Sequence, residues 1–155
     1  MKMKKVLFAA MSAVLCASVC GCSSVAVEGK NDDGKEITAV LERMNKAYRE
    51  KDVKAFMDQV SPSYQGDALD LKTAVENDFA VLVRVEYKTD AVTVEKTPDG
   101  GIVAARVPYS RQAASVRDGI FNKTGTALLK FKPESDGTLK LMRMPVPALY
   151  GLIIP

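Results

Sequence analysis

The sequence predicts an α+β fold in which N-terminal helices pack on a curved antiparallel sheet of about four strands. Two observations support this fold class. Between residues 36 and 82 the apolar side chains recur at the spacing of helix turns, whereas from residue 83 onward they alternate and β-branched residues dominate. Gly, Asp and Pro then cluster where the chain has to turn between strands.

The first predicted helix has one apolar face, formed by Ile37, Val40, Leu41, Met44 and Tyr48. Asp33, followed three residues later by Glu36, fits a capping box at its start. Two shorter helices follow, the second bounded by Asp52 and Pro62 and the third preceded by Asp67 or Asp70.

The segment Pro98–Gly101 predicts the first hairpin turn of the sheet. Closing this turn with Thr97 opposite Ile102 pairs Val94 with Ala105. One face of the hairpin is then apolar and the other mixed, which is typical of an antiparallel sheet that is covered on one side.

Two further turns divide the remaining strands. Asp118–Gly119 predicts the second turn, and Gly125 suggests a bulge in the strand that follows it. A third turn over residues 133–137 would place Phe131 opposite Leu139. The sheet therefore ends in a meander of long strands.

The segment Ala47–Phe56 (AYREKDVKAF), with an acid between two helices, stands at the start of this order of elements. Together they resemble the nuclear transport factor 2-like superfamily, a cone-shaped α+β fold, over roughly residues 36–144. The resemblance implies an apolar pocket inside the cone, in which isomerase-like members use a Tyr and a carboxylate. Asp78, Tyr64, Tyr87 and Tyr109 are residues of these types, but no local motif assigns a catalytic role to any of them.

Arg111 is the further candidate for ligand binding, beside Tyr87, Tyr109 and Asp78. Alternation from Val107 brings Tyr109 and Arg111 to the covered face near the end of their strand. Arg111 would bind an anionic group if it points into the cone, although the simpler expectation is that strand twist turns it into solvent. For Asp78 the simpler expectation is likewise a solvated helix acid.

The N-terminus predicts where the protein resides. Lys2, Lys4 and Lys5 precede an apolar segment, and the 15 residues from Val6 to Cys20 are too few for a membrane-spanning helix, which needs roughly 18 to 20. Val19-Cys20-Gly21-Cys22 resembles the lipobox of bacterial lipoproteins, which implies cleavage after Gly21 and lipidation of Cys22. The alternative is ordinary signal cleavage after Ala26, which would release a soluble protein.

The expected organisation is a signal peptide over residues 1–21, the lipidated Cys and a flexible tether over 22–35, and one α+β domain over 36–155. The resemblance to lipoproteins implies sorting to the outer membrane of a Gram-negative cell, with the domain facing the periplasm, because Ser23 and not Asp follows the lipidated Cys. The domain ends in an uncharged, apolar tail over residues 145–155, which we expect to fold back over the sheet or pocket, the alternative being docking to a partner.

Composition excludes several classes of function. Cleavage after Gly21 removes three Lys and no acid, so the 22 basic residues fall to 19, equal to the 19 acidic ones, and nothing favours nucleic-acid binding. No Cys beyond Cys22 remains, and the chain has no His, which excludes His-based catalysis and His-ligated metal sites. We expect no cofactor and no metal.

These observations predict an envelope lipoprotein whose domain is a non-catalytic binding or interaction module. Its expected partners are the membrane, through the lipid anchor, and a small ligand or an envelope protein. The alternatives are a pocket enzyme of isomerase or hydratase type using Tyr and Asp, and a structural or assembly partner in the envelope. The mixed outer face around Ile102 and Ala104 also allows a homodimer.

Overall fold

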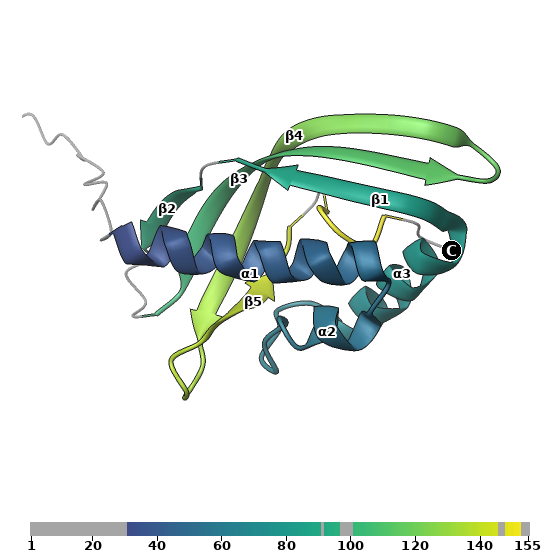
Figure 1. Ribbon diagram of the computed structural model, residues 1–155. Coiled ribbons are helices and arrows are strands. Elements are labelled where there is room, and N and C mark those ends of the chain that lie inside the picture. Colours follow the sequence, from purple (N-terminus) through teal and green to yellow (C-terminus); the bar gives the residue numbers. More distant parts are fainter. Residues whose placement is uncertain (1–30, 91, 97–100, 146–147, 153–155) are drawn as a thin grey trace, which may run out of the picture.

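The computed structural model describes residues 31–90, 92–96, 101–145 and 148–152. Within these residues three helices precede five strands, which confirms the predicted fold class. The first helix lies along the concave side of a curled sheet, and the other two helices lie near one end of it (Figure 1). The elements are α1 (Asn31–Glu50), α2 (Val53–Met57), α3 (Ala68–Val81), β1 (Leu82–Thr89), β2 (Thr93–Lys96), β3 (Val103–Ser115), β4 (Gly119–Pro133) and β5 (Leu139–Arg143).

Strand β3 is the centre of the sheet, because it pairs with β1, β2 and β4. β1 pairs with the half of β3 that ends at Ser115, and β2 pairs with the half that begins at Val103. These two strands therefore lie one after the other along the same edge of β3. The predicted pairing of Val94 with Ala105 is confirmed, whereas the turn residues 97–100 lie outside the described residues.

Gly125 does not form the predicted bulge. It pairs with Tyr109 in a β3–β4 ladder that runs without interruption. The absence of a side chain serves another purpose here, because a Cβ at Gly125 would lie 3.0 Å from the Tyr109 hydroxyl oxygen. The Tyr109 side chain therefore packs over the glycine.

The predicted pairing after the third turn is wrong by two residues, since Phe131 pairs with Leu141 and not with Leu139. The loop that joins β4 to β5 begins after Pro133, and the Glu134 N–H donates to the Thr138 carbonyl at 2.8 Å. A slip of two residues keeps every side chain on its predicted face, so the apolar pattern alone does not distinguish the two registers.

The starts of the helices follow the sequence signals in two cases of three. Asp52 and Asp67 are the N-caps of α2 and α3, and each side chain accepts a backbone N–H bond. The capping box at Asp33 and Glu36 is wrong, because the described part of α1 already includes Asn31, so Asp33 lies inside the helix. Glu36 instead accepts the backbone N–H of Leu139 at 2.9 Å, which ties α1 to the start of β5.

The apolar face of α1 forms the core together with the inward side chains of the sheet and the C-terminal tail. Leu149 and Tyr150 are both 0% exposed, so the prediction that the tail folds back is confirmed for the described residues 148–152. The tail runs between α1 and the sheet (Figure 1, yellow). Leu149 and Tyr150 thereby become part of the hydrophobic core.

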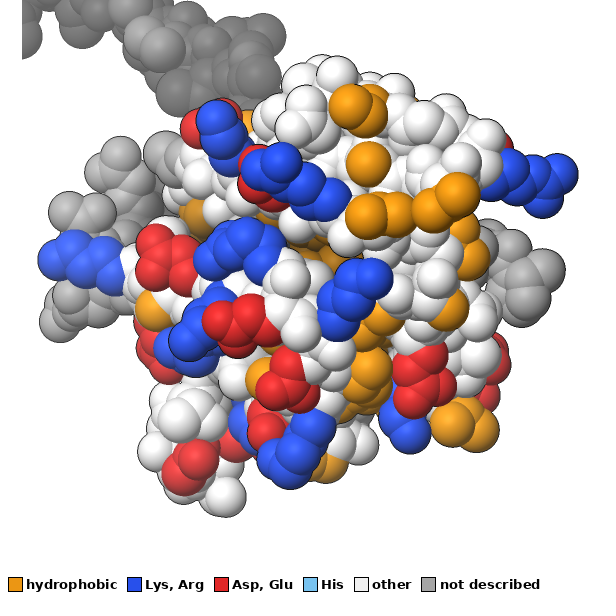
Figure 2. Space-filling model, turned by 45° about the vertical axis from the view of Figure 1, so that its right-hand side comes forward, with side chains coloured by type: hydrophobic (Ala, Val, Ile, Leu, Met, Phe, Trp, Pro, Cys, Tyr) orange, Lys and Arg blue, Asp and Glu red, His pale blue; other side chains and the backbone are white. Residues whose placement is uncertain are grey.

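None of the described helices is long and apolar enough to cross a membrane. Basic and acidic side chains are interspersed on the face shown in Figure 2, without a large patch of one sign. At the outer face considered for a dimer, Ala104 is buried and Ile102 is half-buried.

Candidate functional site

Tyr87 and Arg111 form one polar group on the concave side of the sheet. They are direct cross-strand partners on β1 and β3. Both reach the same atom of the tail: the Tyr87 hydroxyl donates to the Leu149 carbonyl at 2.9 Å, and Arg111 Nη1 donates to it at 3.4 Å. The two side chains thus present hydrogen-bond donors to a single acceptor.

Arg111 does not turn into solvent, and the simpler sequence-based expectation is wrong. The curled sheet keeps it on the inner face, where it is only 5% exposed. Its Nε has no hydrogen-bond partner among the described residues, and no carboxylate in that part of the chain forms an ion pair with it. A desolvated charge that is poorly compensated costs several kcal/mol of folding stability, so Arg111 lowers the stability of the domain at this position.

Tyr48 and Asp78 form a second polar group, between α1 and α3. The Tyr48 hydroxyl donates to Asp78 Oδ2 at 3.0 Å and accepts the Gly151 N–H at 2.7 Å. The Leu152 N–H reaches both carboxylate oxygens, at 2.9 and 3.0 Å. Asp78 is 0% exposed, so the expectation of a solvated helix acid is wrong: α1 and the tail cover this face of α3.

The Tyr150 ring occupies an aromatic slot between these two polar groups. Its centroid lies 5.0 to 5.2 Å from the rings of Tyr48, Phe56 and Tyr87. Its hydroxyl donates to Asn45 Oδ1 at 2.7 Å. Sequence reasoning missed Asn45 and Tyr150 as site residues and treated Tyr48 as core alone, because no local pattern indicates that the tail returns to α1.

Burial raises the pKa of Tyr48, Tyr87 and Tyr150 above the ordinary tyrosine value. At Tyr87 the neighbouring Arg111 acts against this effect, because a cation favours the phenolate. All three hydroxyls are therefore protonated at neutral pH and available as hydrogen-bond donors.

The structure separates the remaining sequence candidates. Tyr109 lies on the same inner face as Arg111, but its ring covers Gly125. Tyr64 is only partly buried and follows α2, where its backbone N–H bonds to Ser61. Tyr87, Arg111 and Asp78 thus meet around the tail, and Tyr64 does not join them. No group of three potential metal ligands exists among the described residues.

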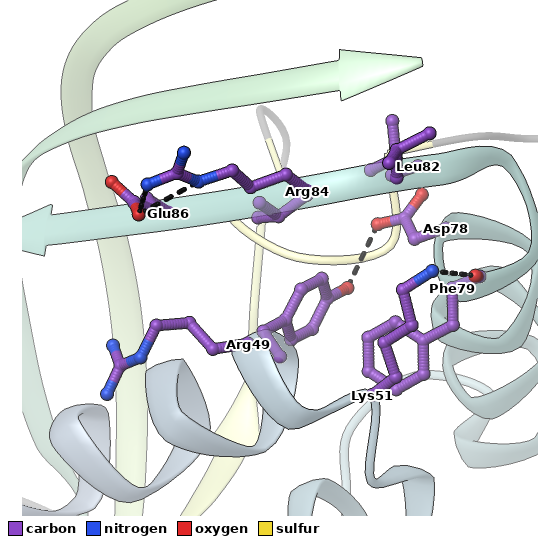
Figure 3. Close-up of a pocket in the computed structure, with 10 residues that line it drawn as sticks. Arg49, Lys51, Asp78, Phe79, Leu82, Arg84 and Glu86 are labelled. Carbon is purple, nitrogen blue, oxygen red and sulfur yellow. Dashed lines mark hydrogen bonds and ion pairs between the residues drawn. The ribbon is translucent and has the colours of Figure 1, made fainter. Parts of the chain in front are cut away.

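A pocket of about 240 Å³ lies beside the Tyr48–Asp78 pair, and both residues are among those that line it. It opens between the end of α1, the end of α3 and the start of β1 (Figure 3). Its basic side chains do not converge on Asp78: Arg84 pairs with Glu86, the Lys51 ammonium donates to the Phe79 carbonyl at 2.9 Å, and Arg49 points away. The basic side chains that line this pocket therefore do not form an anion-binding cluster around Asp78.

No protein-family model matches the chain, and no curated protein is detectably similar in sequence. Solved structures are similar in fold. A proposed aromatic ring hydroxylase from Novosphingobium aromaticivorans superposes with a TM-score of 0.63 at 15% identity, over 80% of this chain and 91% of that one. A proposed dehydratase of the nuclear transport factor 2-like family from Streptomyces avermitilis gives 0.59 at 15% identity, over 76% and 99%.

The fold is the nuclear transport factor 2-like cone. A proposed scytalone dehydratase from Novosphingobium aromaticivorans shares it, with a TM-score of 0.62 at 9% identity over 73% of this chain and 81% of that one. At such identities the likeness concerns the fold alone. The two polar groups and the aromatic slot therefore line the interior of a nuclear transport factor 2-like cone, which the chain's own tail fills.

Proposed function

We propose that the protein is a lipid-anchored lipoprotein of the cell envelope whose cone is a non-catalytic binding module. The observation that carries the binding role is Arg111, a buried cation with a spare Nε donor inside the cone. Folding alone does not favour such a residue, because an apolar side chain would fill the site at lower cost. A ligand with an acceptor group would use it.

The membrane anchor is the lipid on Cys22, with the domain held at the outer membrane and facing the periplasm. Two or more acyl chains give stable retention, whereas one gives only marginal binding. Cys22→Ser is expected to move the protein from the membrane to the soluble fraction with its domain folded, and Cys16→Ser, in the discarded segment, is the matched control. A mature N-terminus at Val27 in mass spectrometry would contradict the anchor.

Native mass spectrometry of the acylated protein, purified from its own membrane, tests the binding role. A retained small molecule that is lost in Arg111→Gln supports the module. Crosslinking that recovers one stoichiometric envelope protein, without any small ligand, would favour the structural or assembly role instead.

A pocket enzyme of isomerase or hydratase type is the second candidate function. The observation in its favour is the Tyr48–Asp78 hydrogen bond beside an open pocket, in a fold shared with two proposed dehydratases. In that case Asp78→Asn abolishes turnover of a ligand identified by mass spectrometry while leaving its binding intact. If Asp78→Asn abolishes ligand binding, and the intact protein does not turn the ligand over, the non-catalytic binding module is supported instead.

A further inference from the structure

The tail segment 149–152 shows which chemical groups the cone interior accepts. The Leu149 carbonyl accepts hydrogen bonds from Tyr87 and Arg111. The Tyr150 hydroxyl donates to the Asn45 side-chain oxygen. The N–H groups of Gly151 and Leu152 donate to Tyr48 and Asp78, respectively. The Tyr150 ring is fully enclosed. The tail thus occupies the positions that a ligand would take, and its atoms show where the polar groups of a ligand would find hydrogen-bond partners.

Arg111 and Tyr87 form the donor end of the site, and the tail satisfies the hydrogen-bonding capacity of this end least well. The Leu149 carbonyl is neutral, lies 3.4 Å from Arg111 Nη1, and leaves Nε without a partner among the described residues. A carboxylate at this position has two oxygens and a full negative charge, and would bond to both Arg111 and Tyr87 at shorter distances. A ligand that carries a carboxylate there therefore has an interaction that the tail lacks.

The covalent structure of the tail gives the spacing between ring and carboxylate. Three atoms separate the Tyr150 ring from the Leu149 carbonyl carbon: Cβ, Cα and the backbone nitrogen. On this basis, and resting on the proposed binding function, we infer that the cone binds phenolic acids whose carboxylate is separated from the ring by about three atoms. The phenol takes the place of Tyr150 against Asn45, the carboxylate bonds to Arg111 and Tyr87, and the tail leaves.

The first test uses the mature domain with Tyr150→Ala, which empties the aromatic slot, and titration calorimetry with 4-(4-hydroxyphenyl)butanoate. 4-Butylphenol lacks the charge, 4-phenylbutanoate lacks the hydroxyl, and 4-hydroxybenzoate lacks the spacer. We expect the phenolic acid to bind about tenfold or more tighter than butylphenol, and about fivefold tighter than phenylbutanoate, from typical charged and neutral hydrogen bonds. Hydroxybenzoate should bind weakly, because it cannot reach both ends.

Adding Arg111→Gln should remove the preference for the acid over butylphenol, whereas Arg106→Gln, an exposed Arg on the same strand, should preserve it. Equal binding of the acid and butylphenol before Arg111 is changed, or an unchanged preference afterwards, would overturn the inference.

The second test uses the unmodified chain and therefore does not depend on the folding of the Tyr150 variant. Amide hydrogen exchange is followed at Gly151 and Leu152, whose N–H groups bond to Tyr48 and Asp78. Saturating phenolic acid should accelerate exchange at these two amides, relative to α1, at least tenfold. Unchanged protection at saturation refutes displacement of the tail. If the purified protein retains a ligand that is neither phenolic nor acidic, the binding module stands and this ligand assignment fails.

Discussion

Replacing Arg111 with Met is the most direct test of whether this residue serves ligand binding or folding. Met has a similar unbranched reach and fills irregular apolar space. The change removes a charge that is 5% exposed, together with one long hydrogen bond to the Leu149 carbonyl. It leaves that carbonyl with the Tyr87 hydroxyl as donor.

The expected gain follows from two opposing terms. Well-packed apolar replacements of buried charges are often stabilising by about 1–4 kcal/mol. The lost hydrogen bond is longer than the optimal range, so it offsets only about 1 kcal/mol. We therefore expect the free energy of unfolding to rise by about 0–3 kcal/mol, and the melting temperature to rise by up to roughly 12 °C for a domain of this size.

Urea and thermal unfolding of the mature domain, followed by circular dichroism, measure this change. Arg106→Met is the matched control, because Arg106 is exposed on the other face of β3 and its ion pair with Glu95 is a surface pair. It should change stability by less than about 0.5 kcal/mol. Destabilisation by Arg111→Met of more than 1 kcal/mol would show that Arg111 holds the tail in place, and would remove the main support for a ligand role.

Three further outcomes follow from the buried tail. Tyr150→Ala should cost about 3–5 kcal/mol in chemical unfolding and Tyr150→Phe about 1, and a cost below 1 for Ala would mean that the tail is not part of the core. Burial raises the pKa of Tyr48, Tyr87 and Tyr150 in the folded state, so the stability that these three groups contribute should be lost as the unfolded state ionises above pH 10, by a few kcal/mol at pH 11. Flat stability between pH 10 and 11 would contradict this. Gly151→Ala should destabilise the domain more than Gly137→Ala in the same assay. Both glycines have positive φ, but only at Gly151 would the new Cβ lie 2.9 Å from another side chain. Equal losses of stability would refute the close packing of the tail at Gly151.

The fold was predictable where its signals are local. The first hairpin follows from alternating side chains on either side of a short turn, so the pairing of Val94 with Ala105 is fixed within a dozen residues. The β4–β5 register failed because its longer loop allows two pairings that bury the same faces, and Phe131 pairs with Leu141 in the one the structure adopts. Glu36 was misassigned because its partner, Leu139, is distant in sequence.

The candidate site was predictable only in part, for the same reason. Strand alternation brought Tyr109 and Arg111 to the covered face, although the simpler expectation turned Arg111 into solvent, and the sequence did not show that a segment from the end of the chain covers Arg111. The bond between Tyr48 and Gly151 joins residues 103 positions apart. Sequence patterns report which face a residue occupies, and say little about what covers that face.

The tail also determines how strongly a ligand must bind. Displacing both Leu149 and Tyr150 exposes two fully buried side chains, at about 1.5–3 kcal/mol each, which would weaken binding to the intact chain by roughly 10² to 10⁴-fold. A ligand that places its own ring in the aromatic slot restores the contacts that the Tyr150 ring gives up. The uncompensated cost is then mainly that of Leu149, and the carboxylate bond to Arg111 offsets it. A ligand therefore needs both an aromatic ring and a negative charge to displace the tail, because either one alone offsets only part of the free-energy cost of exposing Leu149 and Tyr150.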